Sequence, residues 1–409
     1  MIIRPITTAS GISVVAAPGT VLDHARSAVE TVATRLWASE NVHVGRQLPS
    51  VTNYVALLQV AGRSFVAKYS LLGASLVSIV RGQRGTWPKV ETSQQGYVAD
   101  PRAQLALEYA QLRILAAIAR RDAVPLRVPK VIAYEAGVLI TVAVTAPSLS
   151  SELLCGSQPP DELLGYVTNT ARRLQRALGH GHPTLRATLV SRPHSSIADT
   201  YARKFLNPRH AREYLSNLGE GWADPPERRD VRKLLTTLRS VLSALLRPNT
   251  PVVIYGDLKP DHILLEPAGL STWIDPGLQC ADPAAELAKL VSRTMLLLVT
   301  ATPAPDRTSA ILDALDQLLT EFLRHHAPAG THALRRLLAL WLADWSNYLA
   351  TGLSLPPQVG LPLPQTLLAA AARARPLLLV ATEVGAHLVT NPEYAWNLAL
   401  QDCQQLAAD

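Results

Sequence analysis

Residues 251 to 283 read PVVIYGDLKPDHILLEPAGLSTWIDPGLQCADP, and this stretch decides the fold. Three short apolar runs occur in it, at 252–254, 263–265 and 273–274. Runs of this length, bounded by turn residues, predict short buried strands. A polar residue stands near one end of each run: Asp257 three positions after the first, His262 directly before the second and Asp275 directly after the third. Buried strands place such residues and the loops let them act, so we predict a chemical site here.

The second and third runs predict a hairpin that brings two of these polar residues together. A turn at 266–269 would join the strands, with His262 before the first and Asp275 after the second. The two side chains would then be close enough to share a metal ion, and Asp257 would face the same spot.

The motifs of this stretch resemble those of a known family. Tyr255-Gly-Asp-Leu-Lys-Pro-Asp-His262, together with Ile274-Asp-Pro-Gly277 and Ala281-Asp-Pro283, is similar to the aminoglycoside phosphotransferase-like branch of the protein-kinase-like fold. Several coordinated spacings make this signal specific. The resemblance implies an α+β, two-lobed fold. Its parts would be a small N-terminal β-sheet lobe with one helix (1–144, with an insert at 70–101), a hinge (145–150) and a larger, mainly helical C-terminal lobe (151–409).

The same resemblance implies an ATP- and Mg²⁺-dependent phosphotransferase with an alcohol group as acceptor. Catalysis of this reaction is mostly positioning and electrostatic stabilisation. Asp257 would orient the acceptor hydroxyl, and Lys259 would reach the transferring phosphate. His262 and Asp275 would hold Mg²⁺.

The nucleotide would be bound by residues of the first lobe. Lys68, at the end of a strand, would hold the α- and β-phosphates and pair with Glu108 on the next helix. The backbone around Thr141 and Val142 would meet adenine. A glycine-rich loop is missing before residue 54, so the phosphates would be covered by the backbone of loop 48–53 and by three of its side chains: Ser50, Thr52 and Asn53.

Three positions depart from the family pattern. Tyr255 stands where histidine is usual, His262 where asparagine is usual and Pro276 where an aromatic residue is usual. Neutral imidazole is a less ordinary Mg²⁺ ligand than an amide oxygen. The departures keep open a second reading, a pseudokinase scaffold that binds a peptide or a partner enzyme.

Periodicity predicts the remaining elements. Strands are expected at 53–60 and 64–69, joined by a tight turn, and twice more within 128–144. Apolar residues recur at helical spacing in eight segments: 20–40, 103–121, 161–178, 225–246, 284–301, 308–326, 330–350 and 364–388.

The net charge of +7 lies in the first part of the chain. Residues 1–150 hold 15 Lys and Arg against 8 Asp and Glu, while the remainder has 24 of each. Part of this charge falls in the insert, at Arg81, Arg84 and Lys89. The insert is either an extra packing helix or a docking surface for an acidic or peptide partner.

The acceptor is expected to be a peptide. Aminoglycosides are polycations, yet the region from Thr300 has only 9 acidic against 6 basic residues. The chain also resembles kinases of lanthipeptide and thioamitide biosynthesis, which phosphorylate Ser or Thr of a precursor peptide before a separate lyase eliminates phosphate. An aminoglycoside- or macrolide-type antibiotic phosphotransferase stays open as an alternative.

Other composition features favour a cytoplasmic protein without nucleic-acid or membrane partners. No uninterrupted apolar run reaches the length of a membrane span. The three cysteines, Cys155, Cys280 and Cys403, are far apart and lack CxxC spacing, so we expect neither disulfides nor a zinc knuckle.

Overall fold

The computed structural model describes residues 18–80, 84–179, 196–208, 211, 215, 225–246, 251–267, 269–326, 329–355 and 360–408. The chain forms two compact units. Unit 1 comprises Met1–Leu115, Val128–Thr145 and Leu355–Pro364, and unit 2 comprises Ala116–Arg127, Ala146–Ser354 and Gln365–Asp409. The predicted division at residues 144 to 151 therefore misses two segments, 116–127 and 355–364, which belong to the other unit.

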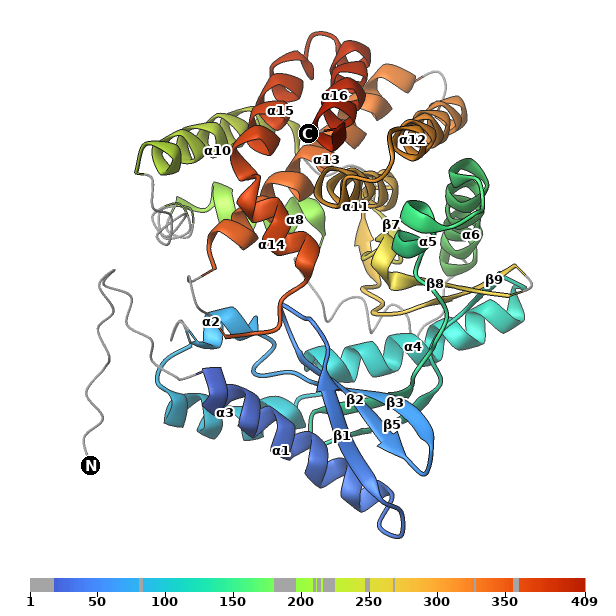
Figure 1. The fold of residues 1–409 in the computed structure, drawn as a ribbon, viewed down its shortest axis with the longest axis vertical. Helices are drawn as coiled ribbons and strands as arrows, with labels where there is room; N and C mark the ends of the chain where they lie inside the picture. Colours follow the sequence, from blue (N-terminus) through green and yellow to red (C-terminus); the bar gives the residue numbers. More distant parts are fainter. Residues whose placement is uncertain are drawn as a thin grey trace. The chain divides into compact units, whose positions relative to one another are not determined.

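Unit 1 is built on one five-stranded antiparallel sheet (Figure 1). Its strand order is β1-β2-β3-β6-β5. The strands are β1 (Val42–Gln47), β2 (Tyr54–Val60), β3 (Arg63–Tyr69), β5 (Val131–Glu135) and β6 (Val138–Val142). The four predicted strands are present, and β1 is an additional edge strand.

Two tight turns fix the register of this sheet. Ala61 and Gly62, between β2 and β3, have φ values of 48° and 76°. Ala136 and Gly137, between β5 and β6, have φ values of 48° and 78°. Positive φ at both central residues is typical of the turn that matches strand twist in two-residue hairpins. The resulting register pairs Lys68 with Leu139 of β6.

Four helices begin in unit 1: α1 (Pro18–Leu36), α2 (Leu76–Val80), α3 (Trp87–Ala99) and α4 (Gln104–Arg121). Four of the five α2 residues are buried in the core of the unit. The apolar start of the insert is therefore a packing element. Arg81 lies outside the described residues, and α3 itself carries one basic residue, Lys89, and one acidic residue, Glu91, so it does not form a basic surface.

Unit 2 is mainly helical (Figure 1). Its longer helices are α6 (Pro160–Gly179), α10 (Pro225–Leu245), α11 (Ala285–Ala301), α12 (Pro305–His325), α13 (Gly330–Leu353), α15 (Ala374–His387) and α16 (Pro392–Ala408). The shorter ones are α5 (Leu149–Cys155), α8 (Ile197–Tyr201), a π-helical segment (Ala202–Leu206) and α14 (Gln365–Ala372). A small sheet unit and a larger helical unit confirm the predicted fold class.

Several helices differ from the prediction. The expected helix 364–388 is interrupted at Arg373 and forms α14 and α15. Helices α5, α8 and α16 were not predicted. Asp282 and Pro283 precede α11 as expected, but the helix begins at Ala285. One Asp282 oxygen accepts a hydrogen bond from the N–H of Ala284 and the other accepts one from Arg336 Nε.

Two small sheets interrupt the helices of unit 2. Strand β7 (Val252–Ile254) pairs antiparallel with β10 (Gln279–Ala281). Strand β9 (Leu270–Trp273) lies between β8 (Ile263–Glu266) and the short β4 (Leu126–Arg127). Helices α11 and α13 pack against each other, and 13 of the 17 residues of α11 are buried. Charged residues on such a helix need partners.

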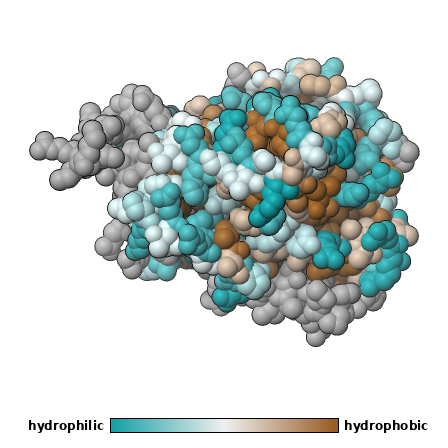
Figure 2. Space-filling model, turned by 90° about the horizontal axis from the view of Figure 1, so that it is seen from below, coloured by the Kyte–Doolittle hydropathy of each residue, from teal (hydrophilic) through white to brown (hydrophobic). Residues whose placement is uncertain are grey.

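The surface carries scattered apolar groups. On the face drawn in Figure 2, hydrophobic residues (brown) gather in patches bordered by hydrophilic ones (teal). Well-exposed large apolar side chains include Leu36, Ile132, Leu368, Leu379, Val389 and Tyr394. No helix in the described residues combines the length and the apolar character that a bilayer crossing requires.

Candidate active site

The turn after β7 is held against the end of β9. The Tyr255 ring lies edge-on to Trp273, with centroids 5.1 Å apart, and its hydroxyl donates to the carbonyl oxygen of Ile274 over 2.7 Å. The Gly277 N–H donates to the Tyr255 carbonyl oxygen. Tyr255 therefore joins the turn to β9 at the position where the family usually has histidine.

Gly256 is required in this turn for two reasons. Its φ of 91° lies in the left-handed region. A Cβ atom at this position would also lie 2.1 Å from the Gly277 carbonyl oxygen, closer than any real contact. The turn can therefore approach residues 275–277 only with glycine here.

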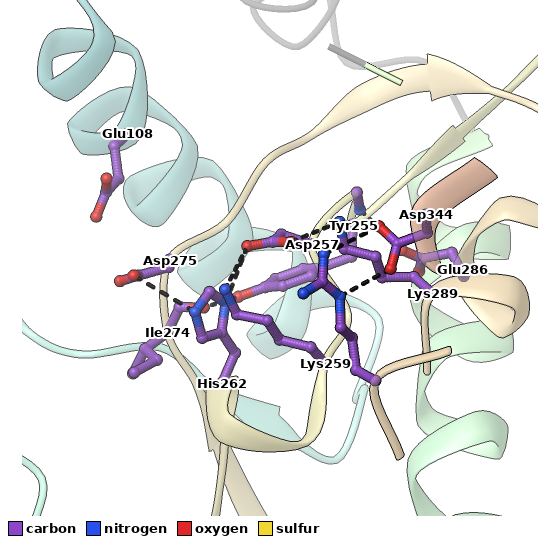
Figure 3. Close-up of polar contacts among 12 residues, drawn as sticks. Glu108, Tyr255, Asp257, Lys259, His262, Ile274, Asp275, Glu286, Lys289 and Asp344 are labelled. Carbon is purple, nitrogen blue, oxygen red and sulfur yellow. Dashed lines mark hydrogen bonds and ion pairs between the residues drawn. The ribbon is translucent and has the colours of Figure 1, made fainter. Parts of the chain in front are cut away.

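The β8–β9 hairpin brings the predicted residues together. Ile263 pairs with Trp273, which places His262 next to Asp275. Nε2 of His262 lies 3.6 Å from Asp275 Oδ2, and Nδ1 lies 3.3 Å from Asp257 Oδ2 (Figure 3). Asp275 has a φ of 57°, a conformation that few residues other than glycine adopt, although aspartate tolerates it. Such outliers gather at functional sites.

Positive charge surrounds the Asp257 carboxylate. Lys259 Nζ lies 3.2 Å from Oδ2, and Lys289 Nζ lies 3.3 Å from Oδ1. Burial by itself would raise the pKa of Asp257, but Lys259, Lys289 and the His262 imidazole offset this and hold the pKa well below its usual range. A carboxylate with so low a pKa is a weak base. Its geometry suits orienting a hydroxyl better than removing a proton in the ground state.

Glu286 on α11 is a site residue that the sequence analysis did not identify. Its Oε1 accepts a hydrogen bond from the N–H of Gly256 over 2.7 Å. Burial raises its pKa to about 7, against the lowering effect of the hydrogen bonds from the backbone of Gly256 and Tyr255. The helix therefore holds the backbone of the turn that carries Asp257.

A buried group of charges behind Asp257 was also missed. Lys289 Nζ lies 3.1 Å from Asp344 Oδ1, and Arg293 donates to both oxygens of Asp344 over 2.7 and 3.1 Å. The Ser292 hydroxyl donates to Asp344 Oδ2. Burial opposes ionisation of Asp344, but Arg293 and Lys289 lower its pKa to about 2.

In unit 1, the structure brings Lys68 and Glu108 into contact. Lys68 Nζ donates to Glu108 Oε1 over 2.6 Å. Both side chains are at least nine-tenths buried. The pair joins β3 to α4 across 40 positions of sequence.

Several backbone N–H groups of loop 48–53 form hydrogen bonds within the protein. The N–H of Leu48 donates to Val55, that of Ser50 to Pro362 and that of Asn53 to the Ser50 hydroxyl. These three N–H groups are therefore engaged within the protein, and cover of the phosphates by the loop backbone stays a prediction. Thr52 is exposed and Asn53 is buried. Phosphate binding by these side chains stays a prediction.

The residues predicted to meet adenine end strand β6 (Val138–Val142). Thr141 is buried and pairs with Val66, and the Val142 N–H donates to the Lys130 carbonyl oxygen over 2.9 Å. The Ala143 N–H donates to Ser64. Contact of residues 141 and 142 with adenine stays a prediction, and these N–H groups already have partners.

Metal binding would rest on few protein ligands. Within the described residues, no group of three or more His, Cys, Asp or Glu side chains is arranged to hold a metal ion. The predicted pair of His262 and Asp275 stands with its ligand atoms 3.6 Å apart.

The chain thus combines a small sheet unit that holds a buried Lys68–Glu108 pair with a larger helical unit in which Asp257, His262 and Asp275 converge. Residues 86–310, more than half of the chain, match the phosphotransferase enzyme family, and the chain belongs to that family. It is a phosphotransferase, as predicted. The match includes Glu108, Asp257, His262 and Asp275, and it begins after Lys68.

Solved structures with a similar arrangement have low sequence identity. A thermostable mutant of aminoglycoside phosphotransferase APH(4)-Ia, in a ternary complex with AMP-PNP and hygromycin B, has 12% identity and a TM-score of 0.47, covering 89% of this chain and 99% of that chain. Macrolide 2'-phosphotransferase MphH from Brachybacterium faecium has 15% identity and a TM-score of 0.37, covering 89% and 97%. Spectinomycin phosphotransferase APH(9)-Ia, in complex with ADP and spectinomycin, has 10% identity and a TM-score of 0.45, covering 87% and 98%. No curated protein matches the chain.

Proposed function

We propose that this chain transfers the γ-phosphoryl group of Mg·ATP to a hydroxyl group oriented by Asp257. The observation that carries the proposal is that Lys259 Nζ and His262 Nδ1 both converge on Asp257 Oδ2, at 3.2 and 3.3 Å. Asp257 is about one third exposed, so an acceptor can reach it. Phosphoryl transfer requires mainly such positioning and compensation of negative charge.

Lys259 and Asp257 have complementary roles in this proposal. Asp257 accepts the hydrogen bond of the acceptor hydroxyl and fixes the direction of attack. Lys259, on the same turn, carries a point charge that can move from Asp257 to the transferring phosphate. Its side chain is 28% exposed, so it retains freedom to do so.

The residues present fit a magnesium ion that is bound mainly through the nucleotide. Mg²⁺ in kinase sites is held by one or two protein groups together with substrate phosphates. Asp275 would supply a carboxylate oxygen and His262 its Nε2. Since Nδ1 of His262 faces Asp257, that contact sets the ring orientation. When bound, the ion would neutralise charge on the phosphate oxygens.

Lys68 would hold the phosphates of the nucleotide in unit 1. The buried Glu108 fixes its ammonium group by a 2.6 Å contact, which limits the positions that the cation can take. Fixed cations stabilise developing negative charge without reorganising during the reaction.

The acceptor in this proposal is a Ser or Thr of a ribosomally made precursor peptide, of the lanthipeptide or thioamitide type, with a separate lyase acting on the phosphorylated product. Three cations, Lys259, Lys289 and Arg293, lie at or behind Asp257. They offset the negative charge of Asp257 and Asp344, so the acceptor position offers little net attraction to a polycationic aminoglycoside.

An antibiotic acceptor is the second candidate, because it is consistent with membership of the family. The purified chain would be incubated with ATP, Mg²⁺ and either the precursor peptides encoded beside its gene, an aminoglycoside or a macrolide. Mass spectrometry would then detect one added phosphoryl group. Phosphorylation of the peptide alone supports the proposal. Phosphorylation of an antibiotic alone would show that the proposed acceptor is wrong and that the proposed phosphoryl transfer is right.

A pseudokinase scaffold is the third candidate, favoured by the engaged N–H groups of loop 48–53. Ligands that bind only the folded state raise its melting temperature. A thermal-shift titration with Mg·ATP, together with the activity of Asp257→Asn, distinguishes an active phosphotransferase from a scaffold. An enzyme is stabilised by Mg·ATP and loses activity with Asp257→Asn, whereas a scaffold shows neither effect.

A further inference from the structure

The two oxygens of the Asp257 carboxylate have different kinds of partner. Oδ2 faces Lys259 at 3.2 Å and His262 Nδ1 at 3.3 Å, on the side of the turn. Oδ1 faces Lys289 Nζ at 3.3 Å, on the side of α11 (Figure 3). Lys259 is 28% exposed, whereas Lys289 is 15% exposed and comes from a helix that is mostly buried. Lys289 is thus the more confined of the two lysine contacts.

Lys289 is itself fixed from behind. Its Nζ lies 3.1 Å from Asp344 Oδ1, and the Asp344 side chain is only 2% exposed. Arg293 binds both oxygens of Asp344, a bidentate geometry that leaves the carboxylate little freedom. Asp344 therefore stands as a rigid anchor on α13, and Lys289 connects this anchor to Asp257.

Neutralising Asp344 does not require Lys289. Arg293 already supplies a full positive charge and two hydrogen bonds to that carboxylate. Burying a second cation beside it is costly unless the cation has another negative partner. That partner is Asp257, so the four groups form an alternating row of Asp257, Lys289, Asp344 and Arg293.

A second residue of α11, Glu286, also contacts the turn that carries Asp257. It is three residues before Lys289 and therefore on the same face of the helix. Glu286 holds the backbone of the turn at Gly256, and Lys289 holds the side chain of Asp257. One helix face thus fixes both the position of the turn and the rotation of its carboxylate.

We propose that Lys289 is a positioning residue for phosphoryl transfer, which holds Oδ1 of Asp257 so that the carboxylate presents a fixed edge to the acceptor hydroxyl. This inference rests on the proposed function. Lys289 acts through the negative charge of Asp257. The effect of substituting Lys289 should therefore disappear when Asp257 is replaced by a neutral residue.

The test is a double-mutant cycle on turnover of Mg·ATP, with water as acceptor or with the peptide or antibiotic that the chain is found to phosphorylate. Misplacing a reacting group by about 1 Å costs on the order of 100-fold in rate. Lys289→Met should lower kcat about 10- to 100-fold and leave KM for ATP within about 3-fold. Lys289→Arg should recover part of the loss. In the Asp257→Asn background, Lys289→Met should change kcat less than about 3-fold.

Lys204→Met is the matched control. Lys204 also contacts α13, donating to the neutral side chains of Asn347 and Thr351. The Lys204→Met variant should lose about as many side-chain contacts as Lys289→Met, while its kcat stays within about 3-fold of wild type. Melting temperatures of all variants show whether they are folded. If Lys289→Met fails to fold, Lys289→Gln takes its place in the same cycle.

The outcomes separate the two claims. Equal losses from Lys289→Met in the wild-type and Asp257→Asn backgrounds, or unchanged kcat in the folded variant, would overturn the positioning role while the proposed function stands. No turnover by the wild type, or equal turnover by wild type and Asp257→Asn, would overturn the proposed function and this inference with it.

Discussion

The Gly256 N–H donates a 2.7 Å hydrogen bond to the buried carboxylate of Glu286. A helix side chain thereby holds the backbone one residue before Asp257. Burial raises the pKa of Glu286 to about 7, against the lowering effect of this hydrogen bond, so the stability of the fold around Glu286 depends on pH.

The first prediction concerns this pH dependence. The folded pKa of Glu286 lies above its ordinary value of 4.5, so the folded state binds more protons than the unfolded state between pH 4.5 and about 7. The stabilising contribution is fully present below pH 4.5 and is lost as pH rises through about 7. Glu286→Gln should flatten the free energy of unfolding across this range, measured by urea denaturation at several pH values. An unchanged slope would contradict the assignment.

The second prediction concerns the turn itself. Gly256→Ala should destabilise unit 2 by more than about 3 kcal/mol, because it adds a positive-φ penalty to a clash with the backbone of Gly277. Gly269→Ala is the matched control, since Gly269 also has positive φ but its Cβ would meet nothing within 4 Å. It should cost only about 1 kcal/mol. Equal costs in the two variants would show that the clash is relieved by small shifts.

The third prediction concerns the nucleotide. Lys68→Met should weaken Mg·ATP binding by about 10-fold or more, since a charged hydrogen bond to phosphate contributes about 1.5–3 kcal/mol. Glu108→Gln should weaken it less, because the lysine remains. Titration calorimetry measures both. Unchanged affinity in folded Lys68→Met would remove Lys68 from the nucleotide site.

The fourth prediction concerns the buried charges. Asp344→Ala leaves Arg293 and Lys289 with an uncompensated positive charge, and breaking such a buried pair costs about 3–5 kcal/mol. The control is Glu321→Ala, which breaks the partly exposed pair with Arg172 and should cost about 1 kcal/mol or less. Chemical denaturation of the two variants tests the contrast. A similar small loss in both would mean that the Asp344 network is not stabilising.

The Asp257, His262 and Asp275 group was predictable because its geometry is local. Three short strands and the turns between them lie within the 24 residues 252–275, and the spacing alone places His262 beside Asp275. The two hairpins of unit 1 were predictable for the same reason, through Gly62 and Gly137. Strand β1 was missed because its six residues include glycine and pair only at the edge of the sheet.

The second group of site residues depends on contacts across long stretches of sequence. Asp344 is 55 residues from Lys289, and no local pattern indicates that they meet. One signal was present. Glu286, Lys289 and Arg293 interrupt a helix that is otherwise apolar on most sides, and charges within a buried helix require partners. The sequence predicts that such partners exist, but their identity requires the fold.

The most direct test of the central claim is the rate of ADP formation from Mg·ATP by the wild type and by Asp257→Asn. Asp261→Asn serves as the control, because Asp261 belongs to the same turn region and accepts a hydrogen bond from Ser150. We predict measurable turnover by the wild type, a loss of about 100-fold or more in Asp257→Asn and a change of less than about 3-fold in Asp261→Asn. Equal rates for wild type and Asp257→Asn would contradict the account.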